Sequence, residues 1–561
     1  MTRLMTAVVQ AFHRASPPGD SPPTRRRRSA AMPTLLAALA AVAAVTSAGR
    51  ARAAGEDPLT IHTDRGPVHG VSANGVRRFL GVPYAAPPVG PLRWRAPEPP
   101  AAWSASLEAT RPGAWCPQTL PVVNLRLGDE SCLFLNVFSP DPPPRRPAPV
   151  MVWIHGGGFT VGSGLDDDPT RLVARTGIVA VTLNYRLGPL GFLAHPLLTA
   201  EDPAHAAGNF GVQDQQAALR WVKRNIAAFG GDPRRVTIFG ESAGGMSVCA
   251  QLLSPLARGL FRRAITQSGP CAIPLPPRAV AEAQGVRFAD ALGCTDASDV
   301  LACLRSKPAH EVLDALPSDP TFLFDRSVNW IPTADGVVLP ADPLGALRRG
   351  RVQRVPVIVG ATRDEGRLFV GMAFNLMGHP IAADQWAGEV DGYFGATAGP
   401  QVRAQYPLAS YPDPGAAFGQ AIGDAILACP AVESARLLAR HVPVYLYEYD
   451  HEPNPFVLPM SGIDLGAFHS AELPYVFAGP VASSGRITFT PAEEQLADVV
   501  TGAWTRFAAR GHPGGAGLRW PRLTRAGRHL SLDTPSALRR HMKRDVCAFW
   551  AEMGWSLAGS S

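Results

Sequence analysis

The sequence predicts an α/β protein with a mostly parallel sheet covered by helices on both faces, and two observations point to this class. Short apolar segments typical of buried strands recur along the chain, at 178–183, 236–239, 355–359 and 444–449. Between the first two, apolar residues recur at helical spacing over 212–229. Strands that alternate with helices favour parallel pairing, because the connecting helix returns the chain to the same end of the sheet.

Length and composition fit one large folded unit. The chain has 561 residues, of which 46% are hydrophobic and 18% are charged. This apolar content is enough for a core, which excludes a disordered protein, and the 55 glycines follow no fixed period, which excludes collagen. No linker follows residue 54, and the helical regions 280–345 and 370–440 are expected to be insertions that cap the sheet. We therefore predict a single domain over 55–561.

The net charge of +7 belongs to the first 54 residues. That segment holds eight arginines and one acid, Asp20, whereas the remaining 45 basic and 45 acidic residues cancel. A neutral domain has no long-range attraction for a polyanion, so we expect no nucleic-acid partner.

Residues 1–54 have the order of a secretory leader. Four arginines at 25–28 precede an apolar run at 35–45, and Ala51-Arg52-Ala53 follows as a cleavage site. The run is too short to span a bilayer comfortably, and the alternative is a buried alanine-rich helix. We predict a mature chain that starts near Ala54, is secreted or periplasmic, and has no stable membrane span.

The first segment with a chemical signal is His155-Gly156-Gly157-Gly158-Phe159, directly after an apolar strand at 150–154. The Pro-rich stretch 140–149 before that strand is interpreted as a turn, because both of its flanks look like core strands. Glycines leave backbone N–H groups open to a ligand, so the loop resembles the oxyanion loop of lipases and esterases. The alternative is an ordinary tight glycine turn.

The strongest local signal is Gly240-Glu241-Ser242-Ala243-Gly244, which matches G-x-S-x-G. A strand at 236–239 precedes it and a helical pattern at 245–253 follows it, which is the context of a nucleophile elbow. The turn is expected to lift the Ser242 hydroxyl above the sheet at a helix N-terminus, where backbone N–H groups stabilise a developing oxyanion.

Together these motifs show that the sequence resembles the type B carboxylesterases, the family of the cholinesterases and the bacterial para-nitrobenzyl-type esterases, over roughly residues 58–555. Further matching segments are F-L-G-V-P-Y-A at 79–85, P-L-R-W at 91–94, E-S-C-L-F-L-N at 130–136, N-Y-R at 184–186, F-G-G-D-P at 229–233 and Q-S-G at 267–269. The resemblance implies an α/β-hydrolase fold, a central mostly parallel sheet flanked by helices with helical insertions.

The resemblance also implies the other catalytic groups. The family's acid lies in a D-E-G turn after a central strand, which indicates Glu365, with Asp364 as the rival that spacing alone cannot exclude. Its histidine lies in an H-x-x-E segment, which indicates His469. With Ser242 these residues follow the chain order Ser, acid, His of the α/β-hydrolases. No metal and no organic cofactor is implied.

Five further residues complete the expected site. The N–H groups of Gly157, Gly158 and Ala243 are expected to bind the oxyanion. Glu241 and Ser268 match family positions that support the catalytic groups, and ordinary buried hydrogen bonding is the alternative for both.

The eight cysteines are expected to form disulfides in an exported protein, but their spacing alone allows 105 full pairings. The family resemblance implies the pairs Cys116–Cys132, Cys294–Cys303 and Cys429–Cys547. Cys249 and Cys271 remain and are expected to be free thiols, since a cysteine on the elbow helix is commonly a buried thiol.

Two features bear on the substrate. Residues 117–131 contain no Trp, Tyr or Phe, so the cation–π site that binds choline esters in cholinesterases is not expected. The run Asp166-Asp167-Asp168 is interpreted as a solvated face, the usual state of a charge run, although it could line the site.

The sequence therefore predicts an exported serine carboxylesterase acting on small neutral esters. A specialised hydrolase of one bulky natural ester or carbamate would have the same motifs. A non-catalytic adhesion module of the same fold is the third interpretation, and the presence of Ser242, Glu365 and His469 argues against it.

Overall fold

The computed structural model describes residues 57–120, 124–316, 328–452, 462–481, 488–515 and 517–554. The predicted leader, residues 1–54, lies outside the described residues. The described residues from Pro58 onwards belong to one compact unit.

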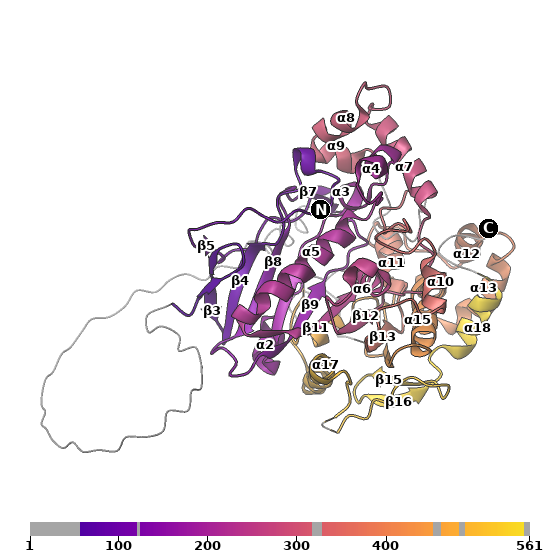
Figure 1. Cartoon of the computed structure of the whole chain (residues 1–561). Coiled ribbons are helices and arrows are strands. Elements are labelled where there is room, and N and C mark those ends of the chain that lie inside the picture. The colour runs from indigo at the N-terminus through magenta and orange to yellow at the C-terminus, as the bar shows by residue number, and fades with distance from the viewer. Residues whose placement is uncertain are drawn as a thin grey trace, which may run out of the picture. The chain divides into compact units, whose positions relative to one another are not determined.

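The centre of this unit is a sheet that, in the described residues, has eleven strands (Figure 1). In chain order these are β3 (Val71–Ala73), β4 (Val76–Pro83), β8 (Phe134–Pro140), β9 (Ala148–Ile154), β10 (Val179–Leu183), β11 (Gly231–Glu241), β12 (Arg263–Gln267), β13 (Val357–Thr362), β14 (Val444–Tyr449), β15 (Arg528–Leu532) and β16 (Ala537–Arg540). Their order across the sheet is β16-β15-β14-β13-β12-β11-β9-β10-β8-β4-β3. The run from β10 to β15 is parallel throughout, and antiparallel strands complete both edges.

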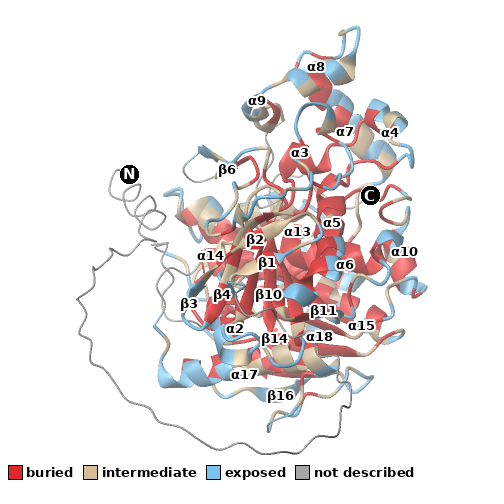
Figure 2. Ribbon diagram, turned by 60° about the vertical axis from the view of Figure 1, so that its left-hand side comes forward, coloured by how far each residue is buried: buried red, intermediate tan, exposed pale blue. Residues whose placement is uncertain are grey.

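Both faces of the sheet are covered, as the strand–helix alternation predicts. Along β9, Val150, Val152 and Ile154 join one apolar cluster, whereas Met151 and Trp153 join a second one on the other face. The first cluster includes α5 (Phe210–Asn225), α6 (Ala243–Leu253) and α15 (Cys429–Ala439), and the second includes α2 (Thr170–Thr176) and α17 (Pro491–Arg510). Figure 2 shows the buried residues concentrated in the sheet and in the helices against it.

The elements expected from the sequence are present with small shifts of their ends. The four apolar segments become β10, β11, β13 and β14, and the pattern over 212–229 becomes α5 followed by a 3₁₀ turn at Ile226–Phe229. The proline-rich stretch does connect two strands, β8 and β9, but they are not neighbours, because β10 lies between them.

Helical insertions follow two of the strands. Between β12 and β13 lie α7 (Arg278–Ala291), α8 (Val300–Ser306), α9 (Ala309–Asp314) and α10 (Pro343–Arg348). Between β13 and β14 lie α11 (Arg367–Val370), α12 (Trp386–Phe394), α13 (Gly399–Gln405), α14 (Pro414–Gly423) and α15. The stretch Pro414–Ala439 is long and apolar enough to cross a membrane, and 94% of its most apolar window is buried inside the protein, so it serves as a core helix here.

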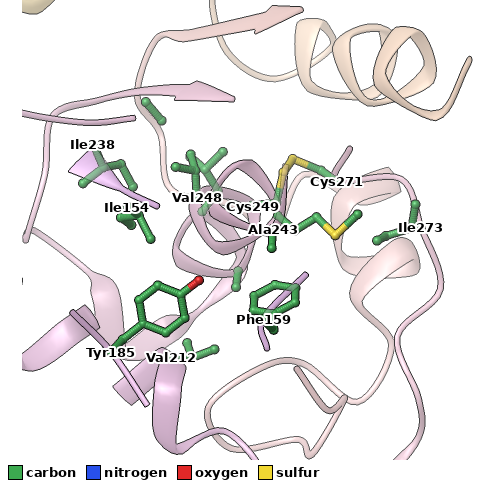
Figure 3. Packing of buried hydrophobic residues seen from close by; sticks show 14 of the residues in the cluster. Ile154, Phe159, Tyr185, Val212, Ile238, Ala243, Val248, Cys249, Cys271 and Ile273 are labelled. Atoms are coloured by element: carbon green, nitrogen blue, oxygen red, sulfur yellow. A yellow bond between two sulfur atoms is a disulfide. The ribbon is translucent and has the colours of Figure 1, made fainter. Parts of the chain in front are cut away.

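All eight cysteines lie in the described residues and all are paired: Cys116–Cys132, Cys249–Cys271, Cys294–Cys303 and Cys429–Cys547. The expectation that Cys249 and Cys271 are free thiols is therefore wrong. Cys249 lies on α6, and Cys271 lies just after β12, the strand against which α6 packs. This packing brings their Cα atoms to 5.1 Å, within the range for a disulfide. The bridge is the yellow bond in Figure 3.

Candidate active site

Ser242 lies between the end of β11 and the start of α6, where the chain reverses sharply. Its backbone angles are φ 56° and ψ −126°, a conformation that non-glycine residues rarely adopt. The surroundings hold it there, since its N–H donates to the carbonyl oxygen of Gln267 at 2.9 Å and its own carbonyl accepts from the N–H of Met246 at 2.9 Å. Ser242 thus has the strained geometry of a nucleophile elbow.

The glycines of G-x-S-x-G are required by close backbone packing. A Cβ atom on Gly244 would lie 2.0 Å from the carbonyl oxygen of Ile154, and one on Gly240 would lie 2.5 Å from the backbone of Gly244. Any side chain at either position would push α6 away from β9 or from its own turn. The motif therefore reflects the tightness of the elbow as well as its chemistry.

The glycine loop after β9 passes directly against the elbow. A Cβ atom on Gly156 would lie 2.8 Å from the carbonyl oxygen of Glu241. Gly157 and Gly158 follow with φ angles of 93° and 60°, which favour glycine. The loop is anchored by His155, whose ring stacks on Tyr185 at 4.4 Å and whose pKa burial lowers to about 4, so it is neutral at neutral pH.

The carboxylate and the imidazole expected from the sequence are in direct contact. Oε2 of Glu365 lies 2.5 Å from Nδ1 of His469, and both side chains are buried. The second oxygen of Glu365 accepts the N–H of Thr362 at 2.8 Å, which fixes the carboxylate at the end of β13. This contact orients the imidazole ring through Nδ1.

Asp364, the alternative candidate for the catalytic acid, contacts other groups than His469. It accepts the N–H of Ala467 at 2.8 Å and pairs with Arg363 and Arg367 at 2.8 and 2.9 Å. These contacts attach the histidine loop to the turn after β13. Among the described residues, the carboxylates in contact with His469 are those of Glu365 and Glu241.

Glu241 lies on the other side of the imidazole. Its Oε1 atom is 3.0 Å from Nε2 of His469 and accepts the hydroxyl of Ser470 at 2.7 Å. Burial lowers the pKa of His469, but the charges of Glu241 and Glu365 outweigh burial and raise that pKa well above its usual value. Among the described side chains, Ser242 makes no hydrogen bond with Nε2 of His469. Catalytic hydrogen bonds are often long before substrate binds.

Two more carboxylates lie close to this group. Glu472 accepts the side-chain amide of Gln267 at 3.0 Å, and burial, followed by the charge of Glu241, raises its pKa to about 8. Asp167 accepts the indole N–H of Trp153 at 3.0 Å, and burial, followed by Asp166 and Glu241, raises its pKa well above its usual value. Both acids therefore favour the neutral form near the catalytic groups.

The expectation of a solvated face at Asp166-Asp167-Asp168 is wrong for the first two residues, since Asp166 is half-buried and accepts hydrogen bonds from Ser163. Asp168 is exposed, whereas Asp167 is buried against Trp153. A charge run gives no sign of this, because the indole partner lies on a strand 14 residues away. Glu472 is the acid of the H-x-x-E segment at 469–472, and this segment is the sequence signal for its place near the site.

Ser268 has a positive φ of 48° and its N–H donates to Gly360 at 2.8 Å. Its buried hydroxyl has no hydrogen-bond partner in the described part of the chain, so the contacts found for Ser268 are those of the backbone. No group of three or more His, Cys, Asp or Glu side chains within the described ranges is arranged to hold a metal ion.

The sheet order, the elbow and the histidine–glutamate pair together define an α/β-hydrolase. The family model of the carboxylesterase family matches residues 57–550, and the chain belongs to this family. It is a carboxylic ester hydrolase by family.

Two relatives and one solved structure are similar to this chain over most of its length. The para-nitrobenzyl esterase of Bacillus subtilis (strain 168) is 36% identical over 474 residues, 82% of this chain and 92% of its own. The fumonisin B1 esterase of Sphingopyxis macrogoltabida is 37% identical over 496 residues, covering 84% and 86%. A PNB esterase structure has a TM-score of 0.72 at 34% identity and covers 88% of this chain and 100% of its own.

Proposed function

We propose that this chain is an exported serine esterase that hydrolyses neutral carboxylic esters through an acyl-enzyme on Ser242. The observation that carries the proposal is the 2.5 Å contact between His469 and Glu365, with Glu241, the residue before Ser242, 3.0 Å from the same imidazole. The contact with Glu241 supports a position of the imidazole beside the strained serine, because Glu241 is the residue directly before Ser242.

The reaction follows from these positions. His469 takes the proton of Ser242 through Nε2 while the serine oxygen attacks the ester carbonyl. Glu365 holds Nδ1 and stabilises the imidazolium that forms. His469 then protonates the leaving alcohol, and a water molecule repeats both steps on the acyl-enzyme. No step requires a cofactor.

The developing oxyanion is bound by backbone N–H groups of Gly157, Gly158 and Ala243 in this proposal. Positive φ angles at both glycines and the close packing of the loop against the elbow support it, since they bring the loop and the start of α6 together. Losing one such donor typically costs about 10²–10³-fold in kcat.

Export is part of the proposal. The paired cysteines support it, because structural disulfides persist in oxidising compartments and are rare in the cytosol of most cells. The leader-like order of residues 1–54 supplies the route, to a secreted or periplasmic location.

The test is the Ser242→Ala variant of the mature chain, assayed with p-nitrophenyl esters and with acetylthiocholine. We expect wild-type activity on the neutral esters, little on the choline ester, and a loss on the order of 10⁴-fold or more in the variant. Ser306→Ala, on an exposed position of α8, is the matched control and should keep full activity. Near-normal turnover by a folded Ser242→Ala variant would contradict the assignment of Ser242 as the nucleophile.

A further inference from the structure

A cavity of about 1000 Å³ lies beside the elbow helix. Its walls are mostly apolar and include Phe159, Met246 and Ile273. Phe159 directly follows the glycine loop, and the N–H of Met246 donates to the carbonyl of Ser242, so the cavity begins within one helical turn of the serine. Apolar surface in this position suits the hydrocarbon part of an ester.

The disulfide Cys249–Cys271 is itself part of the cavity wall. It joins α6 to the segment 270–277, which supplies one side of the cavity. Figure 3 shows the bridge between the helix and this segment, with Ile273 beyond it and Phe159 below the start of α6. The wall and the helix that carries the nucleophile are therefore covalently linked.

The hydrogen bonds found for the segment 270–277 run to elements other than α6. Four of its residues are prolines, which have no N–H group to donate: Pro270, Pro274, Pro276 and Pro277. The N–H groups of Cys271 and Ala272 both donate to the hydroxyl of Ser434, at 2.8 and 2.7 Å, and so tie the segment to α15. Gly269, directly before the segment, packs against Gly245 of α6, and the disulfide then links the segment itself to the same helix covalently.

We propose that the Cys249–Cys271 disulfide determines the selectivity for the acyl chain, by holding one wall of this cavity in place so that linear acyl groups longer than acetyl pack along it. The inference rests on the proposed function and names the substrate class for that site. Each methylene that enters a fixed apolar cavity raises kcat/KM by about fourfold, whereas an acetyl group is too short to reach the wall.

The test compares p-nitrophenyl hexanoate with p-nitrophenyl acetate in wild type and in the double variant Cys249→Ser/Cys271→Ser. The serines keep nearly the same volume and remove the covalent link. We expect the ratio of kcat/KM for hexanoate over acetate to fall about tenfold, mostly through the hexanoate value. A ratio equal to that of wild type overturns the proposal.

The control is Cys429→Ser/Cys547→Ser, which removes a disulfide between α15 and α18 (Arg544–Glu552). This bridge closes 118 residues, more than the 22 of Cys249–Cys271, so its loss destabilises the protein at least as much in the chain-entropy account. The selectivity ratio should nevertheless stay at the wild-type value. An equal fall in both double variants would show that loss of stability, not the cavity wall, changes selectivity.

Ile273→Trp gives a second route that keeps all disulfides. The larger ring fills the cavity and should lower hexanoate turnover about tenfold while acetate turnover is maintained. An unchanged ratio in this variant overturns the proposal even where the double variant does not fold. If wild type hydrolyses neither ester, the proposed function fails; if it hydrolyses both with a ratio insensitive to these changes, only this inference fails.

Discussion

Glu241 places a carboxylate oxygen 3.0 Å from Nε2 of His469, the nitrogen that faces away from Glu365. The imidazole therefore lies between two buried carboxylates, and both favour its protonated form. A general base must be neutral to accept a proton, so the same charge that stabilises the imidazolium in the transition state also limits activity at low pH.

Glu241→Gln should move the acid limb of the pH profile of kcat/KM toward lower pH. Removing the negative charge beside Nε2 lowers the pKa of His469, so more of the imidazole is neutral in mildly acidic solution. The measurement is kcat/KM for p-nitrophenyl acetate from pH 5 to 9. Glu552→Gln, an exposed position of α18, is the control and should leave the profile unmoved. An acid limb that stays in place in Glu241→Gln would show that this carboxylate does not act on the base.

Glu365→Gln should lower kcat by about 10³–10⁴-fold with the fold retained, because the amide cannot hold the imidazole in the reactive tautomer or stabilise its charge. Asp364→Asn is the matched comparison. Asp364 anchors Ala467 and two arginines, so this variant should lose about 3 kcal/mol or more of stability while the folded fraction keeps far more activity than Glu365→Gln. The reverse pattern would make Asp364 the acid.

Glu472→Gln should weaken the pH dependence of stability. The pKa of Glu472 is about 8 in the folded protein against 4.5 for a free glutamate, so the folded state keeps its proton while the unfolded state releases it. Stability then falls as pH rises from about 4.5 to 8, and the amide removes this contribution. His469, with its raised pKa, acts in the same direction and keeps part of the slope. Melting temperatures at pH 5 and pH 9 test this, and an identical difference in variant and wild type contradicts it.

Thiol titration of the denatured, unreduced mature chain should detect no free thiol. All eight cysteines are paired in the structure, including Cys249 with Cys271. The same sample after reduction should give eight. Two thiols before reduction would mean that one of the four disulfides is absent, and eight would place the protein in a reducing compartment.

The sequence predicts the position of the elbow because the tight turn and the expected chemistry require the same glycines. The elbow is visible because Gly240 and Gly244 have no space for a side chain, so the pattern reports the packing itself. The central strands are visible because parallel strands buried on both faces are continuous apolar runs.

Structural features that depend on contacts between distant segments are harder to predict from the sequence than local turns and strands. The edge strands β3 and β16 have three and four residues, too few for a periodic pattern. The pairing of Cys249 with Cys271 depends on how α6 lies on β12, and spacing alone does not encode that. The burial of Asp167 depends on an indole from β9, so three adjacent aspartates look like a surface until the partner is located.

Helix α17 is connected to the catalytic region by hydrogen bonds through Gln267, a residue of the central strand β12. The indole of Trp504 donates to Gln267 at 3.0 Å, and the same glutamine donates to Glu472. A growing chain that already contains Ser242, Glu365 and His469 must still add some forty residues before this helix is complete, a delay of several seconds at about 5–20 residues per second. During synthesis the catalytic residues are therefore added to the chain before the helix that supports them is complete. Ester hydrolysis should begin only when synthesis is almost over, and a prematurely terminated product would carry the catalytic residues without the framework that makes them work.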